Sequence, residues 1–265
     1  LGILLVCTCQ YSLLPVLMGL EGPGNANETA KPLPLSLWFP VDEQEYYLIA
    51  YGRQILDGAI VISFVAYTDI FMFSLIVFPV GQLRILNFML ENFDSYKRKY
   101  ADLHKTASNT DLVAREVFVD MILRHKKIIE YVKRFNDTMS SLMVLQFLQC
   151  SIEIAFICLQ AVANKVTPVL VFFVLTIFLT LILRLFLYHY YANEIIILSE
   201  NLASAVWKSD WYDQPESVKV LMQIFMVHAQ KPLSYTIGPF SDMSLQSIIA
   251  ILKATYSYVM VVYKR

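Results

Sequence analysis

The stretch 243–263 carries polar side chains in a segment otherwise apolar enough to cross a bilayer. The polar groups include Gln246, Ser247, Lys253, Thr255, Tyr256, Ser257, Tyr258 and Tyr263. A polar group in hydrocarbon needs a partner or water, so we expect this segment to line a water-filled path. Leu252, Tyr256, Val259 and Tyr263 follow each other at steps of four, three and four, which places them on one helix face. An ordinary packing stripe would show the same spacing and remains an alternative.

The remaining reactive side chains show no catalytic or metal-binding pattern. The sequence contains no Gly-rich phosphate loop, no HExxH and no GxSxG, and the four histidines are dispersed. The four cysteines lie inside apolar runs, which argues against a disulfide framework or a zinc site. We therefore predict neither an enzyme nor a metal or other cofactor.

The composition indicates the class of protein. Hydrophobic residues make up 57% of the 265 residues and charged residues 16%, and the mean hydropathy is +0.53. These values are typical of an integral membrane protein and not of a soluble domain. The formal net charge of −1 gives no indication of a nucleic-acid partner.

Five segments approach the length of about 20 apolar residues that a bilayer requires. They are residues 1–20, 47–80, 139–163, 168–191 and 243–263. The first has neither an initial Met nor a charged region before it, so we interpret it as a spanning helix and not as a signal peptide. We expect the chain to be the C-terminal part of a longer protein.

The distribution of Lys and Arg predicts the orientation. The loop 21–46 has one lysine among five acidic residues, whereas the segment 81–138 is rich in Lys and Arg. The positive-inside rule places 81–138 in the cytoplasm, so 21–46 and the C-terminus are predicted to be extracellular. An Asn27-Glu28-Thr29 glycosylation sequon in 21–46 agrees with this orientation.

The two predicted cytoplasmic segments, 81–138 and 192–242, are expected to be helical outside the membrane. In 81–138, apolar residues recur near helical spacing among charged ones. In the second segment, Pro215 marks a helix start, and a helix face follows it with Val218, Leu221, Met222, Phe225 and Met226. A hinge rich in Pro and Gly, 230–240, leads to the last span. The predicted fold is all-α, a polytopic membrane bundle with a cytoplasmic anchor.

Ionisable residues inside the spans are rarer and need partners. They include Asp57, Asp69, Glu153 and Arg184. Glu153 and Arg184 lie near mid-span on consecutive antiparallel helices, so they could form an ion pair. Asp57 lies nearer the outer side and could contribute to a ligand pocket.

Several short motifs together resemble the C-terminal signature of insect odorant receptors. They are Trp207 or Trp211, Gln230-Lys231-Pro232, Gly238-Pro239-Phe240, Ser244-Leu245, Ile251-Leu252-Lys253 and Tyr256-Ser257-Tyr258. The loop 33–42, LPLSLWFPVD, also resembles the stretch before the fourth helix of that family. The related gustatory receptors share the helix order, and Thr255-Tyr256 keeps part of their ending, so the two families remain alternatives.

The resemblance implies that the five spans are helices three to seven of a seven-helix receptor. It further implies an odorant-gated, non-selective cation channel in the plasma membrane of olfactory sensory neurons. Such a channel would be a heterotetramer with a co-receptor subunit and would form its pore from the last helix of each subunit. The face of Leu252, Tyr256, Val259 and Tyr263 would then line the pore. Its hydrophobic gate would lie at Val259 and Tyr263 and would close by dewetting.

A small volatile ligand requires an apolar pocket with few polar groups. We expect this pocket in the outer half of the bundle. Its candidate residues are Tyr11, Leu14, Tyr51, Gln54, Ile55, Asp57, Phe156, Gln160, Phe172, Phe173 and Thr176. Core packing is the alternative role for each of them. A transporter and a G-protein-coupled receptor are the other classes considered. The sequence shows no internal repeat of the kind that transporters have. The predicted topology is inverted relative to that of a G-protein-coupled receptor.

Overall fold

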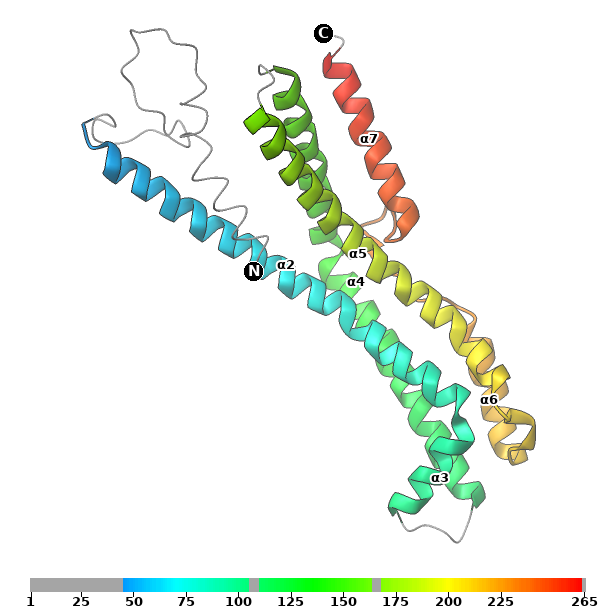
Figure 1. Cartoon of the computed structure of the whole chain (residues 1–265). Coiled ribbons are helices and arrows are strands. Elements are labelled where there is room, and N and C mark those ends of the chain that lie inside the picture. The colour runs from blue at the N-terminus through cyan, green and yellow to red at the C-terminus, as the bar shows by residue number, and fades with distance from the viewer. Residues whose placement is uncertain (1–44, 105–109, 164–167, 264–265) are drawn as a thin grey trace. The chain divides into compact units, whose positions relative to one another are not determined.

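A computed structural model of the chain describes residues 45–104, 110–163 and 168–263 (Figure 1). Helices make up nearly all of the described part. The elements in chain order are α2 (Tyr47–Glu91), α3 (Phe93–His104), α4 (Thr110–Ala163), α5 (Pro168–Lys208), the 3-10 helix η1 (Trp211–Asp213), α6 (Glu216–Ala229), β1 (Thr236–Ile237), β2 (Ser241–Asp242) and α7 (Leu245–Tyr263).

Three of the described helices, α2, α4 and α5, are long and apolar enough to cross a membrane. They contain 45, 54 and 41 residues, which corresponds to about 60 to 80 Å at the rise of an α-helix. The hydrocarbon core of a bilayer is about 30 Å thick, so each helix extends well beyond it. The predicted spans 47–80, 139–163 and 168–191 lie inside these helices, whereas residues 1–20 lie outside the described part.

The chain divides into two compact units, and each long helix contributes to both. The described residues of the first unit are 45–73, 152–163, 168–184 and 258–263. They comprise the first part of α2 with the two residues before it, the end of α4, the first part of α5 and the end of α7. Its core contains Ile154 and Leu181, with the partly buried Val174 and Ile177 packed against them. Apart from these, many large apolar side chains of this unit are exposed, such as Leu48 at 82% and Phe64 at 69%.

The second unit, residues 74–151 and 185–257, has a dense core. Phe118 of α4 is fully buried and makes edge-on contacts with Phe93 of α3 and Phe225 of α6, at ring-centroid distances of 5.9 and 5.7 Å. The ring of His125 lies 5.1 Å from Phe225. Three helices that are separate in sequence therefore share one aromatic centre.

Helix α6 shows how the sequence determines this packing. Pro215 occupies its N-cap with a φ of −56°, and Glu216 lies in the first turn, where a negative charge interacts favourably with the helix dipole. The buried side chains are Val218, Met222, Phe225 and Ala229, at spacings of four, three and four residues. The predicted apolar face is thus confirmed at three of its members, while Leu221 and Met226 are only partly buried.

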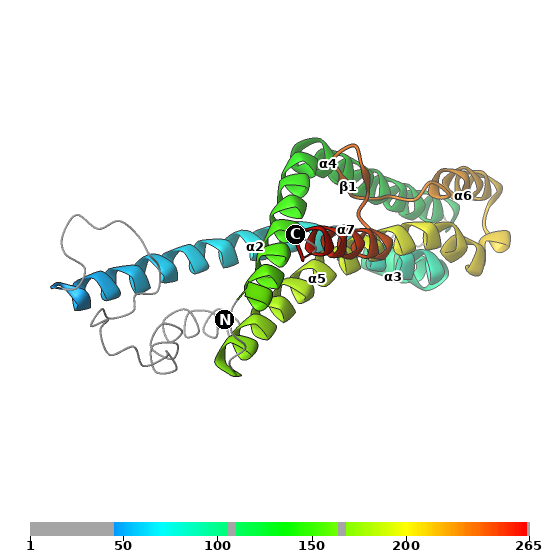
Figure 2. The same cartoon turned by 90° about the horizontal axis from the view of Figure 1, so that it is seen from above.

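The segment between α6 and α7 forms a short hairpin that the sequence did not predict. Thr236 pairs with Asp242 and Ile237 with Ser241 in an antiparallel register. Gly238 at the turn has a φ of +54°, and a Cβ there would lie 2.6 Å from Val144 Cγ2, so only glycine fits. Figure 2 shows this segment leaving α6, passing α4 and turning into α7.

Candidate functional site

The candidate ligand residues of α2 lie in the first unit and differ in exposure. Gln54 is almost completely buried, whereas Tyr51 and Ile55 are partly exposed. The Tyr51 ring stacks on Tyr47 at 5.6 Å. Asp57 accepts hydrogen bonds from Arg53 Nε at 3.0 and 2.9 Å, one helical turn away. This part of α2 thus combines one buried amide with one aromatic pair.

The candidate residues of α5 form one helical turn in the same unit. Phe172 is 66% exposed, and its carbonyl oxygen accepts a hydrogen bond from Thr176 Oγ1 at 2.8 Å. The Thr176 hydroxyl proton is therefore committed to the backbone, and its oxygen remains able to accept. The side chains of Phe156, Gln160 and Phe173 lie outside the described residues, as do Tyr11, Leu14 and Asn27 completely.

An ion pair joins α2 and α5 in the first unit. Arg184 Nη2 lies 2.9 Å from Asp69 Oδ1, with the two side chains 17% and 29% exposed. The partner of Arg184 considered from the sequence was Glu153, and Asp69 was not foreseen. Arg184 Nε is buried without a hydrogen-bond partner among the described residues. The charges of two membrane-length helices thus compensate each other, as charges in a low-dielectric medium require.

Helix α7 has two faces in the second unit. Ser247 and Ile251 are 8% and 0% exposed, whereas Leu252 and Tyr256 are 38% and 65% exposed. Lys253 is also exposed. Val259 and Tyr263 belong to the helix, but their side chains lie outside the described residues. The helix therefore packs within the chain by one face and leaves the described half of the predicted pore face uncovered.

The start of α7 is fixed by its own side chains and by the hairpin. Ser247 Oγ accepts a hydrogen bond from Ser244 N at 3.1 Å and donates one to Ser244 O at 2.6 Å. Met243 N donates to Tyr235 O at 2.7 Å. The predicted hinge 230–240 is thus an ordered connection and not a loose linker.

Two polar side chains hold this connection against α4 and α5. Asn136 of α4 donates to Ser234 O at 2.9 Å and accepts from Thr236 N at 3.1 Å. Its side-chain amide thus pairs with the backbone in the way that the peptide group of a neighbouring strand would. Ser199 of α5 accepts from Leu233 N at 2.9 Å. Sequence reasoning missed both residues, because a single Asn or Ser in an amphipathic helix has no pattern that indicates its long-range partner.

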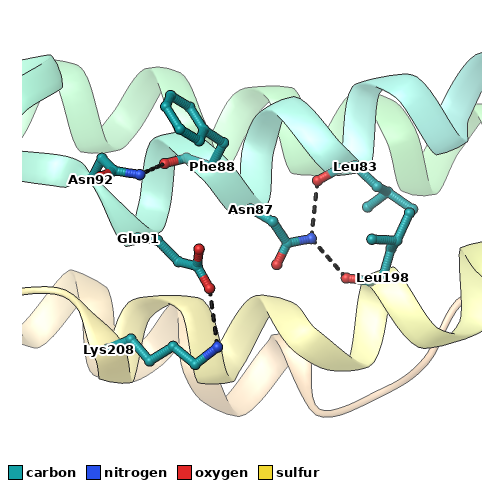
Figure 3. A network of polar contacts seen from close by, with 7 residues as sticks. All are labelled: Leu83, Asn87, Phe88, Glu91, Asn92, Leu198 and Lys208. Carbon is teal, nitrogen blue, oxygen red and sulfur yellow. Dashed lines mark hydrogen bonds and ion pairs between the residues drawn. The ribbon is translucent and has the colours of Figure 1, made fainter.

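A second group of polar contacts joins the end of α2 to α5 (Figure 3). Asn87 Nδ2 donates to the carbonyl oxygens of Leu83 at 3.0 Å and Leu198 at 2.9 Å. Lys208 lies 3.1 Å from Glu91, and Arg84 lies 2.8 Å from Glu194. The exposed ion pairs contribute little individually, so the partly buried Asn87 contact is the more specific one.

The loop after α5 is tied to α3 by one further cluster. Gln214 donates to Asp94 Oδ1 at 2.9 Å and accepts from Lys97 at 2.9 Å, and Lys97 lies 2.7 Å from Asp94. Burial alone would raise the pKa of the Asp94 carboxyl, but the hydrogen bonds from Lys97 and Gln214 outweigh it and lower the pKa below its ordinary value. The cluster is therefore stable with Asp94 ionised.

Three long apolar helices, an ion pair between two of them and the packed helical core of the second unit define a polytopic helical membrane protein. The predicted all-α membrane bundle is thereby confirmed. The chain belongs to the 7tm Odorant receptor family, whose model matches residues 1–256. This membership confirms the resemblance seen in the sequence and places the chain among receptors and not among enzymes.

Individual relatives agree with this family. The chain is 25% identical over 264 residues to "Odorant receptor 10" of Aedes albopictus, covering 96% of this chain and 63% of that protein. It is 22% identical to "Odorant receptor 67c" of Drosophila melanogaster, covering 84% of this chain and 52% of that protein. It is 23% identical to the "Odorant receptor coreceptor" of Aedes albopictus, covering 65% of this chain and 36% of that protein.

A solved structure shows the same fold. The olfactory receptor OR5 from Machilis hrabei, in complex with eugenol, matches with a TM-score of 0.72 at 18% identity. The match covers 99% of this chain and 63% of that one. The chain thus spans less than two thirds of the length of these relatives.

Proposed function

We propose that the chain is part of an odorant receptor subunit that forms an odorant-gated, non-selective cation channel together with a co-receptor. Family membership supports the receptor role. Similarity to co-receptor sequences supports an assembly of related subunits, for which we propose a heterotetramer. The odorant receptor family model favours this interpretation over a gustatory receptor, a transporter or a G-protein-coupled receptor.

The observation that carries the channel proposal is the two-faced packing of α7. Ser247 and Ile251 are buried in the chain, while Leu252 and Tyr256 are exposed on a different side of the helix. With 19 residues, α7 is about 28 Å long, close to the thickness of a bilayer core. We place Leu252, Tyr256, Val259 and Tyr263 along the pore, with a hydrophobic gate at Val259 and Tyr263.

We propose that the odorant binds in the first unit, between residues of α2, α4 and α5. The buried Gln54, the Tyr51 ring and the exposed Phe172 ring would supply one polar and two aromatic contacts. Ile55, Thr176, Phe156, Gln160 and Phe173 complete the proposed lining, and Asp57 stands beside it in its ion pair with Arg53. Tyr11 and Leu14 remain candidates from the first span. A small hydrophobic volatile molecule suits such a lining.

The orientation remains the one that the charges predict. The basic segment 81–138 would lie in the cytoplasm, and both Asn27 and the C-terminus would be extracellular. We propose that Asn27 is glycosylated and that the receptor resides in the plasma membrane of olfactory sensory neurons.

The test is to record odorant-evoked currents from the complete receptor in a heterologous cell, with and without a co-receptor. A cation current that needs both subunits and the odorant is expected. A receptor that reaches the cell surface with its partner and yields no current for any member of a broad odorant panel would contradict the channel proposal. A current of equal size without the partner would contradict the heteromeric assembly.

A further inference from the structure

Pro79 leaves one backbone carbonyl of α2 without its usual partner. It lies inside the helix, and proline has no backbone N–H to donate to the carbonyl four residues earlier. That carbonyl belongs to Leu75. A carbonyl without a donor is costly in an apolar environment, so it requires a partner from elsewhere in the protein.

Two tyrosines from other elements supply this partner. Tyr131 Oη of α4 donates to Leu75 O at 2.9 Å. Tyr235 Oη, from the segment before β1, lies 3.4 Å from the same oxygen. The second distance exceeds the usual range for an O–H···O bond, so Tyr131 makes the stronger contact. A carbonyl oxygen has two lone pairs and can serve both hydroxyls.

Tyr235 is itself held firmly. It is fully buried, and its ring packs on Phe135 of α4 at a centroid distance of 4.3 Å. Asn136 pairs with the backbone on both sides of it, at Ser234 and Thr236. A displacement of Leu75 relative to α4 therefore cannot be absorbed by free rotation of the Tyr235 side chain.

The backbone of Tyr235 connects onward to the last helix. Its carbonyl oxygen accepts a hydrogen bond from Met243 N at 2.7 Å, and Met243 lies two residues before the start of α7 at Leu245. Leu75, Tyr235 and Met243 all belong to the second unit. They form an unbroken series of contacts from the middle of α2 to the entrance of α7.

We infer that the Leu75 carbonyl is a joint that couples movement of α2 to the start of α7. Pro79 leaves this carbonyl without a helical N–H partner, and the hydroxyls of Tyr131 and Tyr235 bind it instead. This inference rests on the proposed function, because it gives the route by which a ligand on α2 opens a pore lined by α7. Tyr131 fixes the carbonyl to α4 as the reference point, and Tyr235 transmits its position to Met243.

The first test compares single hydroxyl deletions in the complete receptor, expressed with its co-receptor. Tyr131→Phe is expected to raise the odorant concentration for half-maximal current on the order of 5-fold, and Tyr235→Phe about 2-fold. Tyr212→Phe is the control, since its side chain is exposed and its hydroxyl donates locally to Asp210 at 3.4 Å. Surface biotinylation must give wild-type amounts for all three variants, which separates coupling from folding.

A double-mutant cycle of Pro79→Ala with Tyr131→Phe distinguishes the proposed joint from a general packing role of Tyr131. Alanine at this position supplies the missing N–H, so the Leu75 carbonyl no longer depends on the tyrosines. Tyr131→Phe is then expected to shift the half-maximal concentration by less than about 2-fold in the Pro79→Ala background. Equal shifts in both backgrounds, or no shift from either tyrosine variant at normal surface expression, would overturn the inference.

A second readout does not depend on channel activity. Hydrogen exchange of the purified receptor in lipid discs reports the amide of Met243 directly. The inference predicts faster exchange at 243–245 in Tyr131→Phe and in Pro79→Ala, although neither change touches those residues. Unchanged exchange there would overturn the joint. Faster exchange together with a wild-type receptor that conducts no current would support the joint and contradict the proposed channel function instead.

Discussion

The two units of the chain bury their apolar side chains to very different degrees. Of the described apolar side chains that are buried, the first unit contributes Ala50, Ile154 and Leu181, and the second unit contributes the rest. On α2 of the first unit, Leu48, Phe64 and Tyr67 are exposed by more than two thirds. The second unit is stabilised by its own core, whereas the first presents apolar surface that lipid, further protein or a ligand can cover.

This difference suggests a division of roles. A densely packed unit resists deformation because its interior has few voids. A sparsely packed unit can adapt to a ligand at small cost, as binding regions of low local stability do. In the proposed receptor, the first unit would recognise the odorant, and the second would hold the hairpin and the start of α7 in register.

The largest effect is expected from truncation in the aromatic centre of the second unit. Phe118→Ala removes a fully buried ring that contacts Phe93 and Phe225, and should reduce the free energy of unfolding by about 3–5 kcal/mol. Phe172→Ala in the first unit changes the same side chain at a 66% exposed position and should cost less than about 1 kcal/mol. Thermal unfolding of purified receptor in detergent measures both. Equal losses of unfolding free energy in the two variants would show that the two units are packed to the same degree.

The next effect concerns the ion pair between α2 and α5 in the first unit. Asp69→Asn leaves the Arg184 guanidinium without its ion-pair partner and is expected to cost about 3 kcal/mol of stability. The control is Asp120→Asn, whose pair with Arg124 is about half exposed and should contribute no more than about 0.5 kcal/mol. Surface expression and thermal unfolding give the comparison. If both variants behave alike, the Asp69 pair does not lie in a low-dielectric environment.

A smaller loss is expected at the hairpin. Asn136→Ala leaves Thr236 N and Ser234 O without their side-chain partner and should destabilise the receptor by about 2 kcal/mol. Asn92→Ala removes an exposed amide that donates to Phe88 O one helical turn away and serves as the control. Limited proteolysis between α6 and α7 should accelerate in the first variant alone. Equal cleavage rates would show that Asn136 does not hold the hairpin.

The smallest effect is a dependence on pH at the junction of α3 with η1. The pKa of Asp94 is lowered in the folded protein, so its ionised form contributes stability above the ordinary value of 3.8 and loses that contribution as the pH falls through the lower folded pKa. Asp94→Asn should therefore cost less than about 1 kcal/mol at pH 7. The difference from wild type should narrow below pH 3.8 in thermal unfolding. A difference that grows on acidification would contradict the assignment.

The sequence predicted those features that depend on periodicity and composition. The membrane-length helices, the start of α6 after Pro215 and its face at Val218, Met222 and Phe225 all follow from spacing. Pairings between distant residues do not, because they depend on how helices pack against each other. The Asp69 partner of Arg184 is one example.

The hairpin before α7 is another feature beyond sequence reasoning. The segment was expected to be a hinge because of its Pro and Gly residues, but the order of the hinge comes from Asn136, Ser199 and Tyr235. The requirement for Gly238 arises from the close approach of Val144. A positive φ could be suspected from the glycine, whereas the side chain that crowds it could not.

The most direct test of the central claim is cysteine accessibility along α7 in conducting receptors. Tyr256→Cys lies on the proposed pore face, and Ile251→Cys lies on the buried face as the matched control. A charged, membrane-impermeant thiol reagent should reduce the odorant-evoked current through Tyr256→Cys, faster with odorant than without, and leave Ile251→Cys unaffected. Equal, odorant-independent reaction at both positions, or no reaction at Tyr256→Cys while current flows, would contradict a pore lined by this face of α7.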